Sequence, residues 1–182
     1  MAGFKQAYLL TEHTEGLYAN SPNDRGGETF CGIASKFWPQ WPGWAIIDSI
    51  KQTYGINANT INLWAKKSEP LQLLIASFYK QNFWDVNKLD FINDQQLANN
   101  IYDFGVNSGV NKAAKSLQSV VGVTVDGIIG NITIAAVNKA NAKNIYTLYN
   151  VARTAFYHKI AVNPGQLQYL PSWMSRIKPY IV

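Results

Sequence analysis

Apolar residues recur at three- and four-residue spacing through most of the chain, which is the period of an amphipathic helix. The pattern predicts a first helix over 4–15, which ends where Gly16 supplies a residue suited to a helix C-cap. Further helices are expected, in chain order, at 45–53, at a short segment capped by Asn59 or Thr60, from Ser68 to near Trp84, at 95–108 with Asp94 as its cap, at 132–140, at 143–162, and in a last short segment from Tyr169 to Ile177.

The pattern changes after the first helix. Residues 21–27 are turn-forming types, and residues 28–34 alternate loosely, as a short strand does. We therefore expect a small β-hairpin near residues 17–34 within a fold that is otherwise mainly α. Length favours one domain, or one domain with a small appended lobe.

Composition limits the class of protein. Hydrophobic residues make up 47% of the 182 residues, with six Trp, ten Tyr and eight Phe, which excludes a disordered chain. No apolar run reaches the roughly 18 residues of a membrane span. The first residues lack the apolar centre of a signal peptide, so we expect synthesis in the cytoplasm without one. Cys31 is the single cysteine, which excludes an intrachain disulfide.

The net charge is +5, which suits a polyanionic partner such as nucleic acid, a cell wall or a membrane surface. The basic residues are dispersed, and only Lys66 and Lys67 are adjacent, so a nucleic-acid partner is not indicated. The two histidines, His13 and His158, lack the spacing of metal ligands. We predict a monomer that needs neither a metal nor a cofactor.

Candidate chemistry lies around the predicted hairpin. Glu15 falls at the C-terminal end of the first predicted helix, where the helix dipole disfavours ionisation and raises a carboxyl pKa, as a general acid requires. Asp24 lies in the returning turn, and Thr29 follows it. The predicted helix end and the returning turn could therefore bring two carboxylates, Glu15 and Asp24, and the hydroxyl of Thr29 to one cleft. Alternatively, Asp24 is only a turn residue.

The segment 36–44 reads KFWPQWPGW, with three Trp and two Pro in nine residues. Aromatic faces stack on sugar rings, so one interpretation is a carbohydrate-binding rim. The alternative, which we favour, is a rigid aromatic loop packed on the core.

The stretch around Glu15 resembles the N-terminal signature of a family of phage- and bacterium-encoded N-acetylmuramidases, the glycoside hydrolase family 108 type. That signature runs Glu-Gly-Gly-Tyr, Pro-x-Asp-x-Gly-Gly-x-Thr and Gly-Ile, and here it reads Glu15-Gly16-Leu17-Tyr18, then Pro22 to Thr29, then Gly32-Ile33. Leu17 replaces the second Gly, and Phe30-Cys31 precedes Gly-Ile. These departures remove no polar group that the chemistry needs.

A second stretch extends the resemblance. The run from Asp103 to Gly109 is similar to an Asp-x-x-x-Asn-x-Gly arrangement of the family, and Asn107 in it could orient an N-acetyl group or simply cap a helix. Asp126 to Thr133 resembles the Asp-Gly-x-x-Gly-x-x-Thr motif of helical peptidoglycan-binding modules. That motif is first a device for a tight turn and a helix start. Trp173 to Arg176 resembles the Trp-x-x-Arg that closes the family's chain.

The resemblance implies a lysozyme-like helical fold, with a catalytic lobe over 1–95 and a helical peptidoglycan-binding lobe over 96–182 packed as one compact unit. It also implies hydrolysis of the bond between N-acetylmuramic acid and N-acetylglucosamine in peptidoglycan. It implies that Glu15 is the general acid and that Asp24 and Thr29 hold the attacking water. It further implies phage lysis or secretion-associated wall remodelling, with release to the wall by a holin-type route or export. The residues for which it implies substrate binding are Tyr18, Tyr102, Asn107 and Trp173.

Two alternatives stay open. A lytic transglycosylase would use Glu15 as its only carboxylate and leave an anhydro product. A non-catalytic wall-binding or secretion-accessory protein would keep the fold without needing Glu15. A zinc amidase or endopeptidase is disfavoured because two histidines cannot supply its ligand set.

Overall fold

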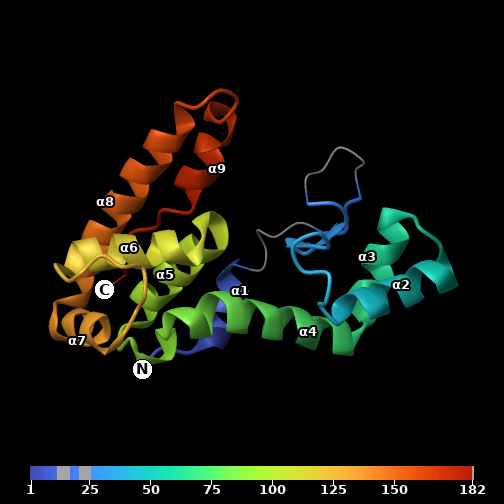
Figure 1. Ribbon diagram of the computed structural model, residues 1–182, viewed down its shortest axis with the longest axis horizontal. Helices are drawn as coiled ribbons and strands as arrows, with labels where there is room; N and C mark the ends of the chain where they lie inside the picture. The colour runs from blue at the N-terminus through green and yellow to red at the C-terminus, as the bar shows by residue number, and fades with distance from the viewer. Residues whose placement is uncertain (12–16, 21–25, 182) are drawn as a thin grey trace. The chain divides into compact units, whose positions relative to one another are not determined.

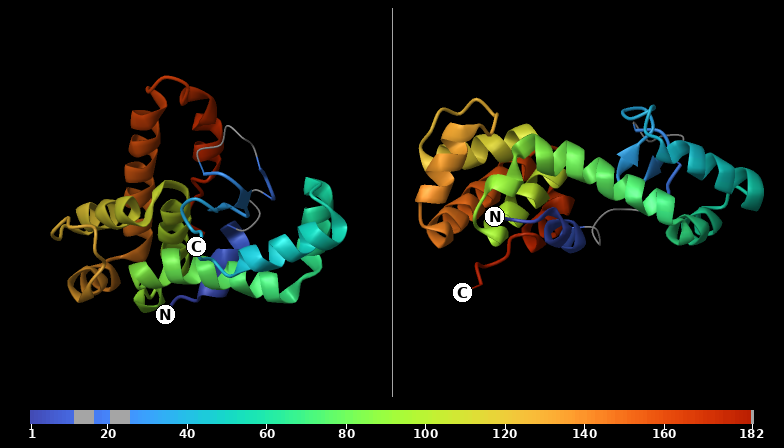
Figure 2. Two further views of the ribbon diagram at one scale, coloured as in Figure 1. Left: turned by 45° about the vertical axis from the view of Figure 1, so that its right-hand side comes forward. Right: turned by 90° about the horizontal axis from the view of Figure 1, so that it is seen from below.

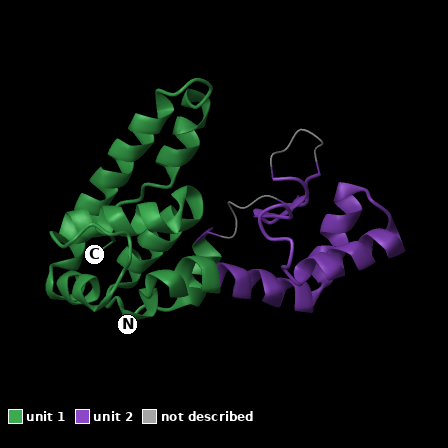
Figure 3. Ribbon diagram, in the orientation of Figure 1, with its two compact units in different colours: residues 1–10, 81–182 green, residues 11–80 purple. Residues whose placement is uncertain are grey.

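The computed structural model describes residues 1–11, 17–20 and 26–181, and in them the chain is mainly helical with one small antiparallel hairpin (Figure 1). The prediction of a mainly α fold with a hairpin near residues 17–34 is thereby confirmed. Contacts divide the chain into a hairpin unit, residues 11–80, and a helical unit, residues 1–10 and 81–182 (Figure 3). The division into a catalytic and a helical lobe stays a prediction.

In its described residues, the hairpin unit contains one two-stranded sheet and three helices. The strands pair antiparallel with Phe30 opposite Ile33, so two residues form the turn between them. The helices follow one another through short connections, as expected from the apolar periodicity. In chain order the elements are β1 (Thr29–Phe30), β2 (Ile33–Ala34), α2 (Gly43–Tyr54), α3 (Ala58–Lys67) and α4 (Glu69–Tyr79).

The helix ends in this unit have the expected chemistry, with one correction. Gly55 ends α2 with a φ of +92°, and Ser68 Oγ accepts a hydrogen bond from the N–H of Leu71 at the start of α4. The prediction that Asn59 or Thr60 caps α3 is wrong. Asn57 is the cap, since its Oδ1 accepts hydrogen bonds from both of those backbone N–H groups.

The core of the hairpin unit joins the sheet to the helices. Phe30 and Ile33 point inward from the strands, and each is at most 2% exposed. The aromatic segment 36–44 packs on this core, because Trp38 and Trp41 both meet the Phe78 ring edge-on, at centroid distances of 4.9 and 6.3 Å. Helix residues complete the core, namely Ile47, Ile61, Leu71 and Ile75.

The helical unit is built from helices and short helical turns. Residues 85–91 contain two 3-10 turns. In chain order the elements are α1 (Phe4–Thr11, whose last residue belongs to the hairpin unit), η2 (Lys80–Trp84, a π-helix that begins in the hairpin unit), η3 (Asp85–Asn87), η4 (Leu89–Phe91), α5 (Gln95–Ser108), α6 (Val110–Val121), α7 (Asn131–Lys139), α8 (Ala142–Ala161), η5 (Leu167–Tyr169) and α9 (Leu170–Ser175).

The helices of this unit pack in neighbouring pairs. Figures 1 and 2 show α6 beside α5 and α9 beside α8 in each view, in agreement with their contacts. Asp94 caps α5, as predicted, through a hydrogen bond of 2.7 Å from the N–H of Leu97. Helix α6 was not predicted. Gly109 both ends α5 and precedes α6, and it has no side chain to cap the second helix, so in the sequence it indicates a helix end more clearly than a new start.

Candidate functional site

The predicted catalytic residues fall in two categories. Glu15 and Asp24 lie outside the described residues. Thr29 begins β1, and its hydroxyl donates a hydrogen bond to the carbonyl of Gly27 at 3.4 Å. Of the predicted substrate-binding residues, Tyr18 belongs to the hairpin unit, while Tyr102, Asn107 and Trp173 belong to the helical unit.

The hairpin unit brings Tyr18 and Thr29 into one local structure. The backbones of Ala19 and Thr29 exchange two hydrogen bonds, of 2.9 and 2.8 Å, which adds a third extended segment beside the hairpin. The N–H of Tyr18 donates to Asn62 Oδ1 on α3 at 2.9 Å. The segment that follows Glu15 in the sequence is therefore fixed to both β1 and α3.

A charged group that we call the Glu28 cluster lies beside this junction and comprises Glu28, Lys51, Asp48 and Tyr18. Lys51 on α2 forms an ion pair with Glu28 and a second one, of 2.9 Å, with Asp48. Its ammonium nitrogen also lies 5.6 Å from the centre of the Tyr18 ring, a cation–π distance. The cluster thus connects α2 to the residue that precedes Thr29.

The electrostatics of the Glu28 cluster favour the protonated forms of Lys51 and of the Tyr18 phenol. Burial alone would lower the pKa of Lys51, but its hydrogen bonds to Glu28 and Asp48 outweigh burial and raise the pKa above its usual value. Burial, together with the negative charge of Glu28, raises the pKa of the Tyr18 phenol. Lys51 therefore stays charged, and Tyr18 stays neutral, at any physiological pH.

The hairpin turn consists of Cys31 and Gly32, both with positive φ, of +46° and +75°. Two consecutive residues with positive φ fit the twist of a two-residue hairpin. Tyr79 at the end of α4 donates a hydrogen bond of 2.7 Å to the carbonyl of Cys31, and this bond attaches the turn to α4. Thr29 is thereby supported at both ends of the hairpin.

In the helical unit, a second charged group forms around Asp103 on α5. We call it the Asp103 cluster and define it as Asp103, Arg153, Arg176, Asn100 and Tyr157. The two carboxylate oxygens of Asp103 accept hydrogen bonds of 2.7 Å from Arg153 on α8 and from Arg176 after α9. One carboxylate thus connects three separate parts of the unit.

Arg153 is the centre of the Asp103 cluster and is 1% exposed. One of its terminal nitrogens donates to the carbonyl and the side-chain oxygen of Asn100, and the other donates to Asp103 and to the hydroxyl of Tyr157 at 2.8 Å. Its guanidinium also lies 4.9 Å from the centre of the Phe104 ring. A planar group with several fixed donors suits such a site better than a lysine would.

Two of the predicted substrate-binding residues, Asn107 and Trp173, meet at Tyr157. The Tyr157 hydroxyl donates to Asn107 Oδ1 at 2.9 Å, and its ring stacks on Trp173 with 5.8 Å between centroids. Ser108 Oγ also donates to Asn107 Oδ1, at 3.1 Å. Both Asn107 and Trp173 are partly exposed, whereas Tyr157 is fully buried. The structure therefore joins the two expected residues through a third that the sequence analysis did not identify.

Tyr102 has a different environment. Its side chain is fully buried, and its ring meets those of Phe4 and Trp84 edge-on, at 5.8 and 6.0 Å. Tyr102 thus packs in the core of the helical unit, and its assignment to substrate binding stays a prediction. Its contribution to the site is to support α5, the helix that carries Asp103 and Asn107.

The Asp-Gly motif forms a compact loop before α7. Gln118, 1% exposed, donates to Asp126 at 2.7 Å and to the carbonyl of Ile128, and it accepts from the N–H of Gly127. Gly127 has a φ of +85°, and a Cβ atom there would lie 2.2 Å from the Asn111 amide. The motif is therefore a structural device, as the sequence suggested.

Asp126 itself is held in its ionised form. Hydrogen bonds from the Ile128 backbone and from Gln118 keep the pKa of Asp126 below its usual value. Its carboxylate is thus occupied in ordering the loop.

A shallow groove of about 610 Å³ runs along the outer face of α8. Its polar groups hold the final segment of the chain, since Tyr146 and Asn150 both donate to the carbonyl of Lys178, at 3.1 and 2.8 Å. The surface that the groove leaves exposed is mostly apolar. None of the expected site residues lines it.

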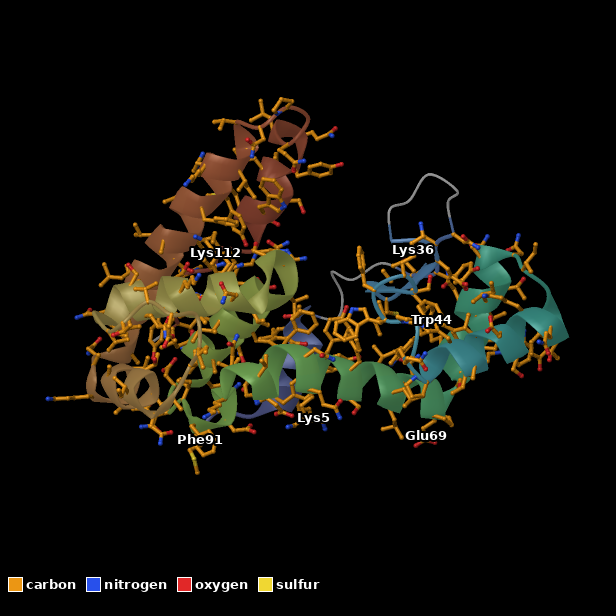
Figure 4. All side chains as sticks on the ribbon, in the orientation of Figure 1. Lys5, Lys36, Trp44, Glu69, Phe91 and Lys112 are labelled. Atoms are coloured by element: carbon orange, nitrogen blue, oxygen red, sulfur yellow. The ribbon has the colours of Figure 1, made fainter. Side chains whose placement is uncertain are left out.

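The remaining chemistry is limited within the described ranges. These contain no group of three or more His, Cys, Asp or Glu side chains placed to hold a metal ion. Nor does any helix in them have the length and apolar character needed to cross a membrane. In Figure 4, Trp44 and Lys112 mark α2 and α6, and around them aromatic and polar side chains gather. The Lys112 ammonium lies 4.6 Å from the Phe156 ring centre.

The residues that sequence analysis missed share one property. Glu28, Lys51, Arg153 and Tyr157 act through contacts between elements distant in the sequence, which local periodicity cannot show. A weak signal exists for one pair, since Arg153 and Tyr157 are four apart on a predicted helix and so share a face.

Comparison with known proteins places this geometry in context. The model of the family described as glycosyl hydrolase 108 matches residues 9–109, and the model described as predicted peptidoglycan domain matches residues 112–178. The structure of SagA from Brucella abortus is similar to this chain, with 26% sequence identity and a TM-score of 0.64, over 96% of this chain and 88% of that one. A comparison with curated proteins gives no match.

Proposed function

Because this chain belongs to the glycosyl hydrolase 108 family and carries a peptidoglycan domain after the family's own segment, we propose that it is an N-acetylmuramidase. Membership supports peptidoglycan hydrolysis in general. The proposal adds the bond between N-acetylmuramic acid and N-acetylglucosamine. The observation that carries it is the family match over 9–109, which contains the complete run from Glu15 through Asp24 to Thr29.

In the proposed mechanism, Glu15 is the general acid that protonates the leaving oxygen of the glycosidic bond. Asp24 and Thr29 hold the attacking water, and the Asp24 carboxylate accepts a proton from it as the water attacks the anomeric carbon. Support for this comes from the hairpin, which fixes Thr29 through Ala19, through Tyr79 and through the Glu28 cluster. The distance between the Glu15 and Asp24 carboxyl groups would predict the stereochemistry. A separation of roughly 5 Å implies retention of the anomeric configuration, and one of about 6.5–9.5 Å implies its inversion.

Substrate binding is proposed for Tyr18 in the hairpin unit and for Asn107 and Trp173 in the helical unit. A partly exposed amide and a partly exposed indole ring together suit an N-acetylated sugar, because the amide can hydrogen-bond and the ring can stack. The two rival activities are a lytic transglycosylase and a wall-binding accessory protein without catalysis.

The test is digestion of purified peptidoglycan by wild type and by Glu15→Gln, with products reduced and analysed by mass spectrometry. We expect muropeptides with reducible muramic acid ends from wild type and none from the variant, since Gln cannot donate the proton. Glu69→Gln, the same change on an exposed residue of α4, is the matched control and should retain activity.

Each other result selects a rival. Anhydromuramic ends would indicate a transglycosylase, and products from Glu15→Gln at the wild-type rate would remove Glu15 as the acid. The absence of products from every protein would indicate a binding or accessory role. Asp24→Asn distinguishes the two interpretations of Asp24. The substitution should remove much of the activity if the carboxylate holds the attacking water, and little of it if Asp24 is only a turn residue.

The biological setting is proposed as phage lysis or secretion-associated wall remodelling. In both, the protein would be made in the cytoplasm and would reach the wall by holin-type release or export. Expression inside a bacterium should then cause lysis only when the inner membrane is permeabilised. Lysis at the same rate with an intact membrane would contradict this route.

A further inference from the structure

A chain of hydrogen bonds in the helical unit runs from Asp103 to Asn107. From it we infer that Arg153 and Tyr157 fix the Asn107 side chain so that its amide nitrogen donates to the ligand. The matching ligand group is an acceptor, which on a wall sugar is the carbonyl oxygen of the N-acetyl group. This inference rests on the proposed function and states which partner donates the hydrogen bond and which accepts it.

The first step concerns Arg153, which can only donate hydrogen bonds. Its side chain is 1% exposed, and the nitrogen that faces Tyr157 is held by the Asp103 carboxylate at 2.7 Å. The Tyr157 hydroxyl, 2.8 Å away, therefore accepts from Arg153. Because Arg153 stays charged at all accessible pH values, this assignment does not change with pH.

The second step follows from the single hydrogen of the Tyr157 hydroxyl. Since this hydroxyl accepts from Arg153, its own hydrogen points to its other partner, which is Asn107 Oδ1 at 2.9 Å. The Ser108 hydroxyl donates to the same oxygen, at 3.1 Å. Two donors therefore select the oxygen of the Asn107 amide and disfavour the flipped orientation.

The third step is the consequence for a ligand. Within the described residues, the hydrogen bonds of the Asn107 side chain all involve Oδ1. The NH₂ group of this partly exposed residue is then the part that meets a ligand, and it requires an acceptor. Trp173 stacks on the other partner of Asn107, the Tyr157 ring, and adds apolar surface suited to the acetyl methyl group.

This direction predicts discrimination between two forms of the wall. An acetamido group offers the required carbonyl oxygen. A de-N-acetylated sugar carries an ammonium group, which has only donors and would oppose the NH₂ group of Asn107. Arg153 and Tyr157 act through Asn107 and are thus positioning residues for N-acetyl recognition.

The experiment measures binding of the full chain to purified peptidoglycan by co-sedimentation, in the Glu15→Gln background. Two wall preparations are compared, one native and one chemically de-N-acetylated. We expect Asn107→Asp to weaken binding to the native wall by about tenfold, because a carboxylate cannot donate to the carbonyl. On the de-N-acetylated wall the same variant should bind more tightly than its parent, because it accepts from the ammonium group.

The controls separate recognition from charge and folding. Asn163→Asp makes the same charge change on an exposed residue after α8 and should bind both walls as the parent does. Tyr157→Phe keeps the aromatic packing but releases the amide orientation, so the ratio of native to de-N-acetylated affinity should fall towards one. A merely structural role for Tyr157 would lower both affinities and leave that ratio unchanged.

The outcomes are decisive in either direction. Inverted preference in Asn107→Asp, with Asn163→Asp unchanged, supports the inference. Equal preference in Asn107→Asp and its parent overturns it, as does a parent that binds neither wall. These results do not depend on cleavage, so a failure of the muramidase assignment in the digestion experiment is distinguished from a failure here.

Discussion

The Glu28 cluster and the Asp103 cluster both neutralise a carboxylate with basic side chains, but they differ in burial. In the hairpin unit, the Lys51 and Glu28 side chains retain 16% and 20% of their exposure, and Asp48 retains 58%. In the helical unit, Arg153 retains 1% and is surrounded by hydrogen-bond acceptors. Water therefore reaches the groups of the first cluster but not the Arg153 guanidinium, although Asp103 and Arg176 in the second cluster keep 18% and 13% of their exposure.

This difference indicates two uses of an ion pair. A partly exposed pair contributes little to stability, since solvent screens it and the side chains lose entropy. Breaking a buried pair leaves an uncompensated charge and costs far more. We therefore regard the Glu28 cluster as an adjustable support for the hairpin and the Asp103 cluster as a fixed frame for Asn107.

The largest expected effect comes from Arg153→Met. Removal of the guanidinium leaves Asn100 and Tyr157 short of a donor in a buried site and leaves Asp103 with Arg176 alone, so we expect a loss of about 3–5 kcal/mol in the free energy of unfolding. Hydrogen exchange read by mass spectrometry should show faster exchange in α5 and α8 and little change in the hairpin unit.

Arg153→Lys sharpens this result. A lysine keeps the charge, but its single ammonium cannot reach all three acceptors in the fork geometry, so only part of the stability should return. A cost for Arg153→Met that does not exceed the cost for Lys51→Met would contradict the distinction between the two clusters.

Lys51→Met should have a smaller effect, about 1 kcal/mol, because the pair is partly solvated. The effect depends on pH. The raised pKa of Lys51 adds stability that is fully present below its unfolded value of 10.5 and is lost as the pH rises through its folded value. The variant should thus lose stability less steeply above pH 10.5 than wild type does, as chemical denaturation at a series of pH values would show.

Asp48→Asn is the matched control for Lys51, since it removes only the exposed partner. It should leave stability almost unchanged. Some alkaline loss must persist in every variant, because burial raises the pKa of Tyr149 far above 10 and its hydroxyl donates to the Ala113 carbonyl in the core. Identical alkaline profiles for wild type and Lys51→Met would show that the ion pair with Glu28 contributes nothing.

Local sequence signals predicted much of the fold. The end of α2 at Gly55, the caps at Ser68 and Asp94 and the hairpin all depend on residues within a few positions of one another. The cap of α3 was placed at Asn59 or Thr60, but it is Asn57. The Asn57 side chain accepts hydrogen bonds from the backbone N–H groups two and three residues later, and the sequence alone does not show which of these polar residues does so. Helix α6 was missed because Gly109 gives it no cap.

The candidate site was harder to predict for a physical reason. Asn107 and Trp173 were identified singly, but their connection depends on Tyr157, which lies 50 residues beyond Asn107 in the sequence. Tyr102 was assigned to substrate binding by resemblance alone, and its ring packs in the core with Phe4 and Trp84. Side-chain contacts between distant helices leave no period in a single sequence. The roles of Glu15 and Asp24 stay predictions.

The hairpin turn offers a practical use beyond catalysis. Cys31, the one thiol of the chain, occupies a turn position with positive φ, where asparagine is preferred and is followed here by the favoured glycine. Cys31→Asn should therefore remove the thiol while easing the backbone, as a thermal melt would check. The product is a cysteine-free background into which single labels can be placed, so that distances between the two units can be followed by spectroscopy while the enzyme engages the wall.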